Sequence, residues 1–103
     1  MSALVHGRKV AVVLQKSDEA DATIDVLEAD FPDIHIDDQG TYWLIQANDE
    51  IRIDMERVSQ ELGREISLSM WLVVMTSFVG RAQPGADYFL VTSQMVDLEA
   101  LNG

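Results

Sequence analysis

The sequence lacks several residue types that common kinds of protein chemistry require. None of its 103 residues is cysteine, which excludes disulfides, iron–sulfur clusters, thiolate zinc sites and cysteine nucleophiles. Its only histidines are His6 and His35. The residues three positions before them are Ala3 and Pro32, so the Glu-x-x-His pairs of carboxylate-bridged iron sites are absent. We therefore expect a protein with no metal and no cofactor of its own.

Motifs for nucleotides and signals for membranes are missing as well. The six glycines are scattered, and they form neither a Gly-x-Gly-x-x-Gly pattern nor a P-loop. The densest apolar patch, Met70–Met75, is about a third of the ~20 residues that a membrane helix needs. The first residues show no export signal. These features favour a cytoplasmic protein that does not enter a membrane.

Positive charge is scarce: 7 basic residues stand against 18 acidic ones, which gives a formal net charge of -11. Phosphate groups would repel such a chain, so we expect no nucleic-acid partner. The acid pairs Asp37-Asp38 and Asp49-Glu50 lie near turns, but neither fits the twelve-residue calcium loop. Most of the carboxylates are expected to form a solvated surface, and some could steer the protein toward a basic partner.

Apolar residues make up 48% of the chain, which is enough for the core of one domain. We assign this domain to residues 9–96, with a short flexible arm at 1–8 and a C-terminal tail at 97–103. The composition and length together predict a folded chain rather than a disordered one.

The first third of the chain predicts a strand followed by a helix. The β-branched run Lys9–Gln15 is typical of a strand in the centre of a sheet. Ser17 is an N-cap candidate with acids directly after it, and Pro32 should end the helix. The helix should turn one apolar stripe inward, made of Ala20, Ile24, Leu27 and Phe31.

Short strands and short helices account for the rest. Three alternating segments joined by turns predict an antiparallel meander, and they are Ile34 to Ile36, Tyr42–Ile45 and Glu50–Ile53. Asp54 and Ser67 are N-cap candidates for two short helices, and Gly63 should close the first. The last two strands are expected at Val73–Val79 and Tyr88–Thr92, with a turn at Gln83–Ala86 between them. The pattern predicts an α+β fold, a compact two-layer domain with the order β-α-β-β-β followed by short helices and a β-β pair.

Few residues are candidates for chemistry, so recognition of a partner is the better prediction. His35 should face away from the core, and a catalytic group that uses it with serine and aspartate stays open, because such residues meet only in space. Arg81 directly follows Gly80 at the end of a predicted strand. Arginine is enriched at binding hot spots, so Arg81 is either a contact residue or a solvated turn residue.

The sequence resembles the coupling or effector proteins of soluble bacterial diiron monooxygenases, the regulatory components of methane, alkene, phenol and toluene monooxygenases. The resemblance spans residues 10 to about 99. It rests on the order and spacing of several motifs: Val12–Glu19, Tyr42–Ile45, Ile51–Asp54, Glu61–Arg64, Thr76–Ala82 and Phe89–Ser93.

The resemblance implies a cofactor-free, non-catalytic α/β protein that docks on the hydroxylase component over its diiron site. Docking in this family alters oxygen activation, substrate access and electron transfer, and a reductase competes for or shares the same surface. The implied interface here is Val74, Thr76, Ser77, Phe78, Gly80 and Arg81. Thr76 and Ser77 keep the small polar character of the family's docking strand.

Departures from the family pattern limit what can be carried over. Val74 and Phe78 stand where the methane-type proteins usually have Asn and Thr, which favours a substrate larger than methane. Only about eight residues precede the first strand, so functions of the longer methane-type arm are not transferred. Two other hypotheses stay open: an acidic inhibitor or adaptor that binds a basic partner, and a small enzyme that uses an acid pair such as Asp37-Asp38.

Overall fold

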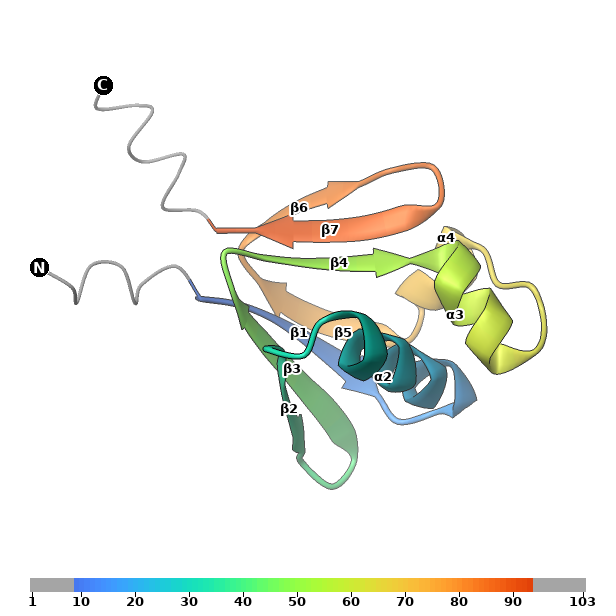
Figure 1. The fold of residues 1–103 in the computed structure, drawn as a ribbon, viewed down its shortest axis with the longest axis horizontal. Helices are drawn as coiled ribbons and strands as arrows, with labels where there is room; N and C mark the ends of the chain where they lie inside the picture. Colours follow the sequence, from blue (N-terminus) through green and yellow to red (C-terminus); the bar gives the residue numbers. More distant parts are fainter. Residues whose placement is uncertain (1–8, 94–103) are drawn as a thin grey trace, which may run out of the picture.

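A computed structural model describes residues 9–93 of the chain. The expected arm at 1–8, the tail at 97–103 and the domain end at 96 lie outside this range. Helices and strands follow in this order: β1 (Lys9–Gln15), α2 (Asp18–Asp30), β2 (His35–Asp38), β3 (Tyr42–Asn48), β4 (Glu50–Asp54), α3 (Met55–Leu62), α4 (Leu68–Leu72), β5 (Met75–Val79), β6 (Arg81–Pro84) and β7 (Tyr88–Thr92). The α+β prediction is confirmed (Figure 1).

Two antiparallel sheets form the framework. Sheet A has four strands in the order β2-β3-β1-β5, and sheet B has three in the order β4-β7-β6. Strand β1 is central, as its sequence predicts, because β3 pairs with one side of it and β5 with the other. Strand β5 ends sheet A and strand β6 ends sheet B, so two strands that are consecutive in the chain lie at the edges of different sheets.

Local chemistry accounts for most of the helix ends, although Asp54, which precedes α3, makes no side-chain capping hydrogen bond. The Ser17 hydroxyl accepts a hydrogen bond from the Ala20 N–H at 3.0 Å, and three acids in the first turn favour the positive end of α2. Gly63 ends α3 in the left-handed conformation with φ 84°. The Ser67 hydroxyl caps α4 by accepting from the Met70 N–H at 3.2 Å.

One hydrophobic core fills the space between the two sheets and the helices. Strand β1 contributes Val10, Val12 and Leu14, while Leu27 of α2 and Trp71 of α4 are fully buried against them. Other large core residues are Ile24, Val26, Ile45, Ile51, Ile53, Met55, Val58, Ile66, Phe89 and Val91. Within residues 9–93, no helix has the length and apolar composition needed to cross a membrane.

The meander prediction is wrong in its third strand. Strands β2 and β3 pair as expected, but β4 leaves sheet A and pairs with β7 in sheet B (Figure 1). The chain makes this switch at Asp49, which has φ 73°. The Asp49 carbonyl accepts a hydrogen bond from the Ser93 N–H at 2.9 Å, which joins this crossover to the end of β7.

Three smaller differences concern the ends of elements. Residues Arg81–Pro84 form β6 rather than only a loop and turn, which an edge strand permits because the proline lies at its last position. The strand expected to start at Val73 starts at Met75. Phe31 follows α2 as its C-cap and is 42% exposed, so the buried stripe ends at Leu27.

Candidate functional site

Strand β5 is the most exposed strand in the described part of the chain. Four of its five residues are exposed, and among residues 9–93 it pairs with β1 alone. Thr76 and Ser77, two of the expected contact residues, therefore face solvent. An open strand edge presents unpaired backbone donors and acceptors to neighbouring molecules. Proteins usually cover or block such an edge, or bind a partner through it.

A bulge interrupts β5 at Thr76. Val13 of β1 lies opposite Ser77 while Leu14 lies opposite Met75, which leaves Thr76 as the additional residue. Its hydroxyl donates to the Val13 carbonyl at 3.3 Å. Bulges bend an edge strand and redirect its side chains, so the bulge sets the directions in which Thr76 and Ser77 point.

Phe78 lies at the rim of the core rather than fully on the surface. It is opposite the buried Val12 in the β1–β5 ladder, so its side chain points to the core side of sheet A. Its ring meets Phe89 edge-on, with centroids 5.8 Å apart, yet the side chain keeps 38% of its exposure. Phe89 in turn packs against the buried Trp71, with the two ring centroids 5.5 Å apart.

Gly80 forms the corner at which the chain passes from sheet A to sheet B. Its φ of 132° is a conformation that other residues rarely adopt. A Cβ at this position would lie 2.6 Å from the Thr92 carbonyl oxygen and 2.8 Å from a Val91 methyl. The backbones of β5 and β7 can approach this closely only because the residue is glycine, so Gly80 sets the geometry of the surface without offering a side chain to it.

The remaining expected contact residues lie at the two ends of this region. Arg81 is exposed and begins β6, opposite Thr92 of β7. Val74 is only half exposed and packs on the core, while its carbonyl accepts from the Gln15 N–H at 2.9 Å. We define the edge segment as residues 75–84, which contains β5, Gly80 and β6. Of the expected residues, only Val74 lies outside it.

Charge is distributed unevenly between this region and the helices. Between residues 66 and 86 the only charged residue is Arg81, in a chain with net charge -11. Helix α2 instead carries five exposed acids: Asp18, Asp21, Asp25 and Glu28, together with Asp30 at its last position. The protein therefore has one nearly uncharged surface region and, elsewhere, a strongly acidic one.

Sequence reasoning missed two exposed apolar side chains next to β5. Val73 is 80% exposed and Met70 is 49% exposed, although both lie in the densest apolar patch of the sequence. Both lie where a short helix is followed by a strand. The periodicity of the sequence assigns no residue there to a buried or an exposed face, so the sequence contained no signal for their exposure.

The sequence-predicted acid pair does not form a site. Asp37 and Asp38 lie on opposite faces of β2, because their ladder partners Leu44 and Trp43 are consecutive residues of β3. Lys16 is hydrogen-bonded to Asp38 at 2.5 Å and holds the pKa of that carboxyl below its ordinary value. Asp37 lies 3.3 Å from the exposed His35. Two carboxylates that point apart cannot share one substrate.

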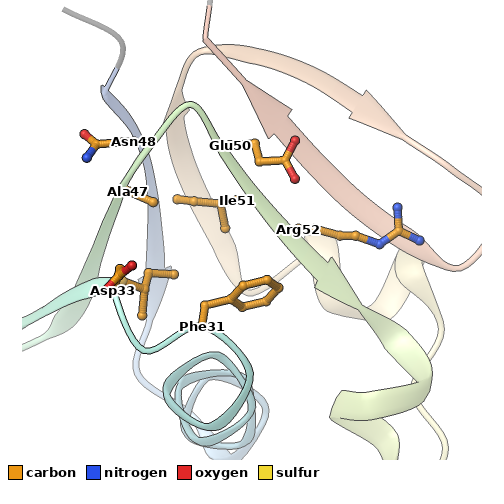
Figure 2. Close-up of a pocket in the computed structure, with 8 residues that line it drawn as sticks. Phe31, Asp33, Ala47, Asn48, Glu50, Ile51 and Arg52 are labelled. Atoms are coloured by element: carbon orange, nitrogen blue, oxygen red, sulfur yellow. The ribbon is translucent and has the colours of Figure 1, made fainter. Parts of the chain in front are cut away.

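A shallow hollow of about 290 Å³ opens between the end of α2 and the start of β4 (Figure 2). Phe31 and Ile51 lie on either side of it, and Asp33 and Glu50 contribute carboxylates. The residues that line it include no histidine, serine, threonine or lysine. The hollow thus holds no nucleophile paired with a base. Across residues 9–93, no group of three or more metal-ligating side chains is placed to hold an ion.

Comparison with curated proteins finds regulatory components of monooxygenases. Methane monooxygenase regulatory protein B of Methylococcus capsulatus (strain Bath) is 34% identical over 96 residues, which cover 87% of this chain and 68% of that protein. The effector subunit of the alkene monooxygenase system of Xanthobacter autotrophicus (strain Py2) is 35% identical over 74 residues, covering 70% of this chain and 73% of the subunit.

Solved structures agree with this result. A chain of a phenol hydroxylase–regulatory protein complex superposes with a TM-score of 0.73 and 25% identity, covering 82% of this chain and 97% of that one. The soluble methane monooxygenase regulatory protein B gives a TM-score of 0.69 and 34% identity, covering 88% and 69%. The MmoB/DmpM family model matches residues 8–92, so this chain belongs to the MmoB/DmpM family.

Proposed function

We propose that this protein is the regulatory component of a multicomponent diiron monooxygenase and binds its hydroxylase. Its relatives are regulatory or effector proteins of methane and alkene monooxygenases, and a structural neighbour comes from a complex of phenol hydroxylase with its regulatory protein. The protein is a non-catalytic component. It modulates oxygen activation, substrate access and electron transfer in the oxidation of a small alkene, alkane or aromatic hydrocarbon.

The observation that carries the proposal for this chain is its nearly uncharged, open edge segment. A surface that combines exposed apolar groups, small polar groups and a single arginine matches the composition of interface cores, from which other charges are depleted. Thr76, Ser77 and Arg81 are exposed there. We assign hydroxylase contact to Val74, Thr76, Ser77, Phe78, Gly80 and Arg81, with Gly80 acting through backbone geometry.

Regulation requires that binding favour one state of the hydroxylase over another. A partner that binds one state more tightly shifts the population toward it by the difference in binding free energy. A reductase that uses the same hydroxylase surface would compete with this protein, so activity should depend on stoichiometry. We place the protein in the cytoplasm, as expected for a component of a soluble monooxygenase, because one structural neighbour is the regulatory protein of a soluble methane monooxygenase.

The alternative function is an acidic inhibitor or adaptor that binds a basic partner. The acidic face of α2 fits this role, because Asp18, Asp21, Asp25 and Glu28 are all exposed on it. An inhibitor of this kind would bind through α2 and would weaken steeply with added salt. The edge segment would then be free of contact, which separates the two functions experimentally.

Titration into a reconstituted system tests the proposal. The protein alone should be colourless and inactive, and it should raise coupled turnover when added to the cognate hydroxylase and reductase. Turnover should then reach a plateau or fall in excess, because extra protein competes with the reductase. A titration that leaves both turnover and coupling unchanged would reject the regulatory role. Hydrocarbons of increasing size, from methane and propene to phenol and toluene, would then identify the substrate class.

A further inference from the structure

We propose that Met70 and Val73 form an apolar anchor that inserts into an uncharged hollow on the hydroxylase. The two residues lie outside the interface assigned above: Met70 is within α4, and Val73 is its C-cap residue, two positions before β5. The inference rests on the proposed function for the identity of the partner. To the proposed hydroxylase interface, the inference adds Met70 and Val73 as an attachment point that binds through apolar contact.

Exposure and rigidity distinguish these two side chains. Val73 is 80% exposed, the highest value among the exposed large apolar residues of 9–93, and Met70 is 49% exposed. Between them Trp71 is fully buried, and its indole N–H donates to the Thr23 hydroxyl at 3.0 Å. The Val74 N–H closes the turn by donating to the Trp71 carbonyl at 2.9 Å. The anchor therefore projects from a turn that is already fixed, and binding loses little backbone entropy.

The surroundings of the anchor fit an apolar contact. A hollow of about 390 Å³ adjoins Met70 and is lined by Met55, Ile66, Leu68 and Ala86. Glu65 and Asp87 also line it and place two carboxylates at the edge of this hollow. An apolar centre with charged groups around it is the arrangement in which a few residues supply most of the binding energy. The partner surface should accordingly be apolar opposite Val73 and Met70, and it should carry no acidic group opposite Glu65 and Asp87.

The anchor is continuous with the edge segment. Val73 lies two residues before β5, and Val79, which is 63% exposed, is the last residue of that strand, which spans about 13 Å. Arg81 follows at the far end. One surface can thus carry an apolar attachment at one end and a directed hydrogen-bonding group at the other.

The hydroxylase is a better occupant than a second copy of this chain. Each copy carries a formal charge of -11, so two copies repel one another at low ionic strength. We therefore assign the anchor to a heterologous partner and treat self-association as an outcome of the test.

Affinity measurements with matched variants test the anchor. Val73→Ser should raise the Kd for the cognate hydroxylase by about 10-fold, and Met70→Gln by about 5-fold, because truncated anchors lose on the order of 1 kcal/mol or more. Phe31→Ser is the matched control, since Phe31 is 42% exposed and lines the separate hollow of Figure 2. It should leave the Kd within about 2-fold. Urea unfolding midpoints of all variants exclude loss of fold.

The absence of native cysteine allows a second, direct readout. An environment-sensitive fluorophore on Val73→Cys should shift to shorter wavelength when hydroxylase is added, whereas the same label on Asp25→Cys of α2 should not. If Val73 variants bind as tightly as the wild type and the label does not respond, the anchor is wrong although the regulatory role stands. If the wild type fails to bind the hydroxylase, the proposed function itself fails. If the label shifts as this protein alone is concentrated, the occupant is a second copy and the proposal is overturned.

Discussion

The ring of Phe78 meets the ring of Phe89 edge-on, with centroids 5.8 Å apart and planes at 72°. This contact ties the exposed strand β5 to the core, because Phe89 is buried and itself contacts Trp71. A residue assigned to the interface thus also contributes to stability. Any functional change caused by substituting it has to be separated from a change in folding.

Phe78→Thr is expected to destabilise the protein by about 1–2 kcal/mol, less than for a fully buried ring, because the side chain remains 38% exposed. Val79→Thr is the matched control, since Val79 is 63% exposed, and it should change stability by less than about 0.5 kcal/mol. Urea unfolding measures both. Equal effects would mean that the Phe78–Phe89 contact contributes nothing. Under conditions in which Phe78→Thr remains folded, it should also alter the preference of the hydroxylase for substrate size.

Gly80→Ala should be strongly destabilising because a Cβ would lie 2.6 Å from the Thr92 carbonyl oxygen. Gly40→Ala serves as the control: Gly40 also has positive φ, at 89°, but a Cβ there would meet nothing within 4 Å. Both variants incur the strain of a left-handed backbone. The Gly80 variant should lose about 1–3 kcal/mol more, by overpacking alone. Similar unfolding midpoints for the two variants would show that β5 and β7 can move apart at this corner without loss of stability.

Thr23→Val should cost about 1–3 kcal/mol, because it leaves the buried indole N–H of Trp71 without its acceptor at nearly unchanged volume. The same replacement at the exposed Thr41 is the control and should be close to neutral. Thermal and urea unfolding would check the difference. A Thr23→Val protein as stable as the wild type would mean that water or another group satisfies the indole.

The ion pair between α2 and α3 should make stability depend on pH. Arg57 donates to both carboxylate oxygens of Asp30, at 2.8 and 3.0 Å, and thereby lowers the pKa of Asp30. Because the folded pKa is the lower one, the pair stabilises the protein above the unfolded value, about pH 4, and this stabilisation is lost as pH falls through the folded pKa.

A double-mutant cycle with Arg57→Gln and Asp30→Asn isolates this effect. The coupling between the two substitutions should be favourable at pH 7 and should disappear at a pH below the folded pKa of Asp30, where the wild-type carboxyl is protonated. Urea unfolding at the two pH values supplies the coupling. A coupling that is the same at both would show that the pair acts through packing rather than charge.

Local sequence signals predicted the elements well where the cause is local. Strand β1 has the expected bounds, and the caps at Ser17, Gly63 and Ser67 all form. Which strands pair was less predictable. The alternation of Glu50–Ile53 predicts a strand. No local sequence signal indicates that Asp49 adopts a left-handed conformation and that the strand after it pairs in the second sheet. Strand β6 was missed because Pro84 and Gly85 are typical of a turn.

The candidate surface was predictable only in part. The sequence showed that Arg81 follows a predicted strand, and the structure shows that Arg81 is exposed. The exposure of Val73 was not visible, because an apolar residue between a helix and a strand has no periodic pattern that assigns it a face. The partial burial of Val74 and Phe78 depends on packing against the core, for Phe78 on the Phe89 ring, which only the tertiary structure brings together.

Hydrogen–deuterium exchange of the protein with and without its cognate hydroxylase tests the central claim most directly, because it reports both whether binding occurs and where. We expect slower exchange of amides in residues 73–84, which contain the edge segment, while the solvent face of α2 stays unchanged. Protection confined to α2 with residues 73–84 unaffected, or no protection anywhere at saturating hydroxylase, would contradict it.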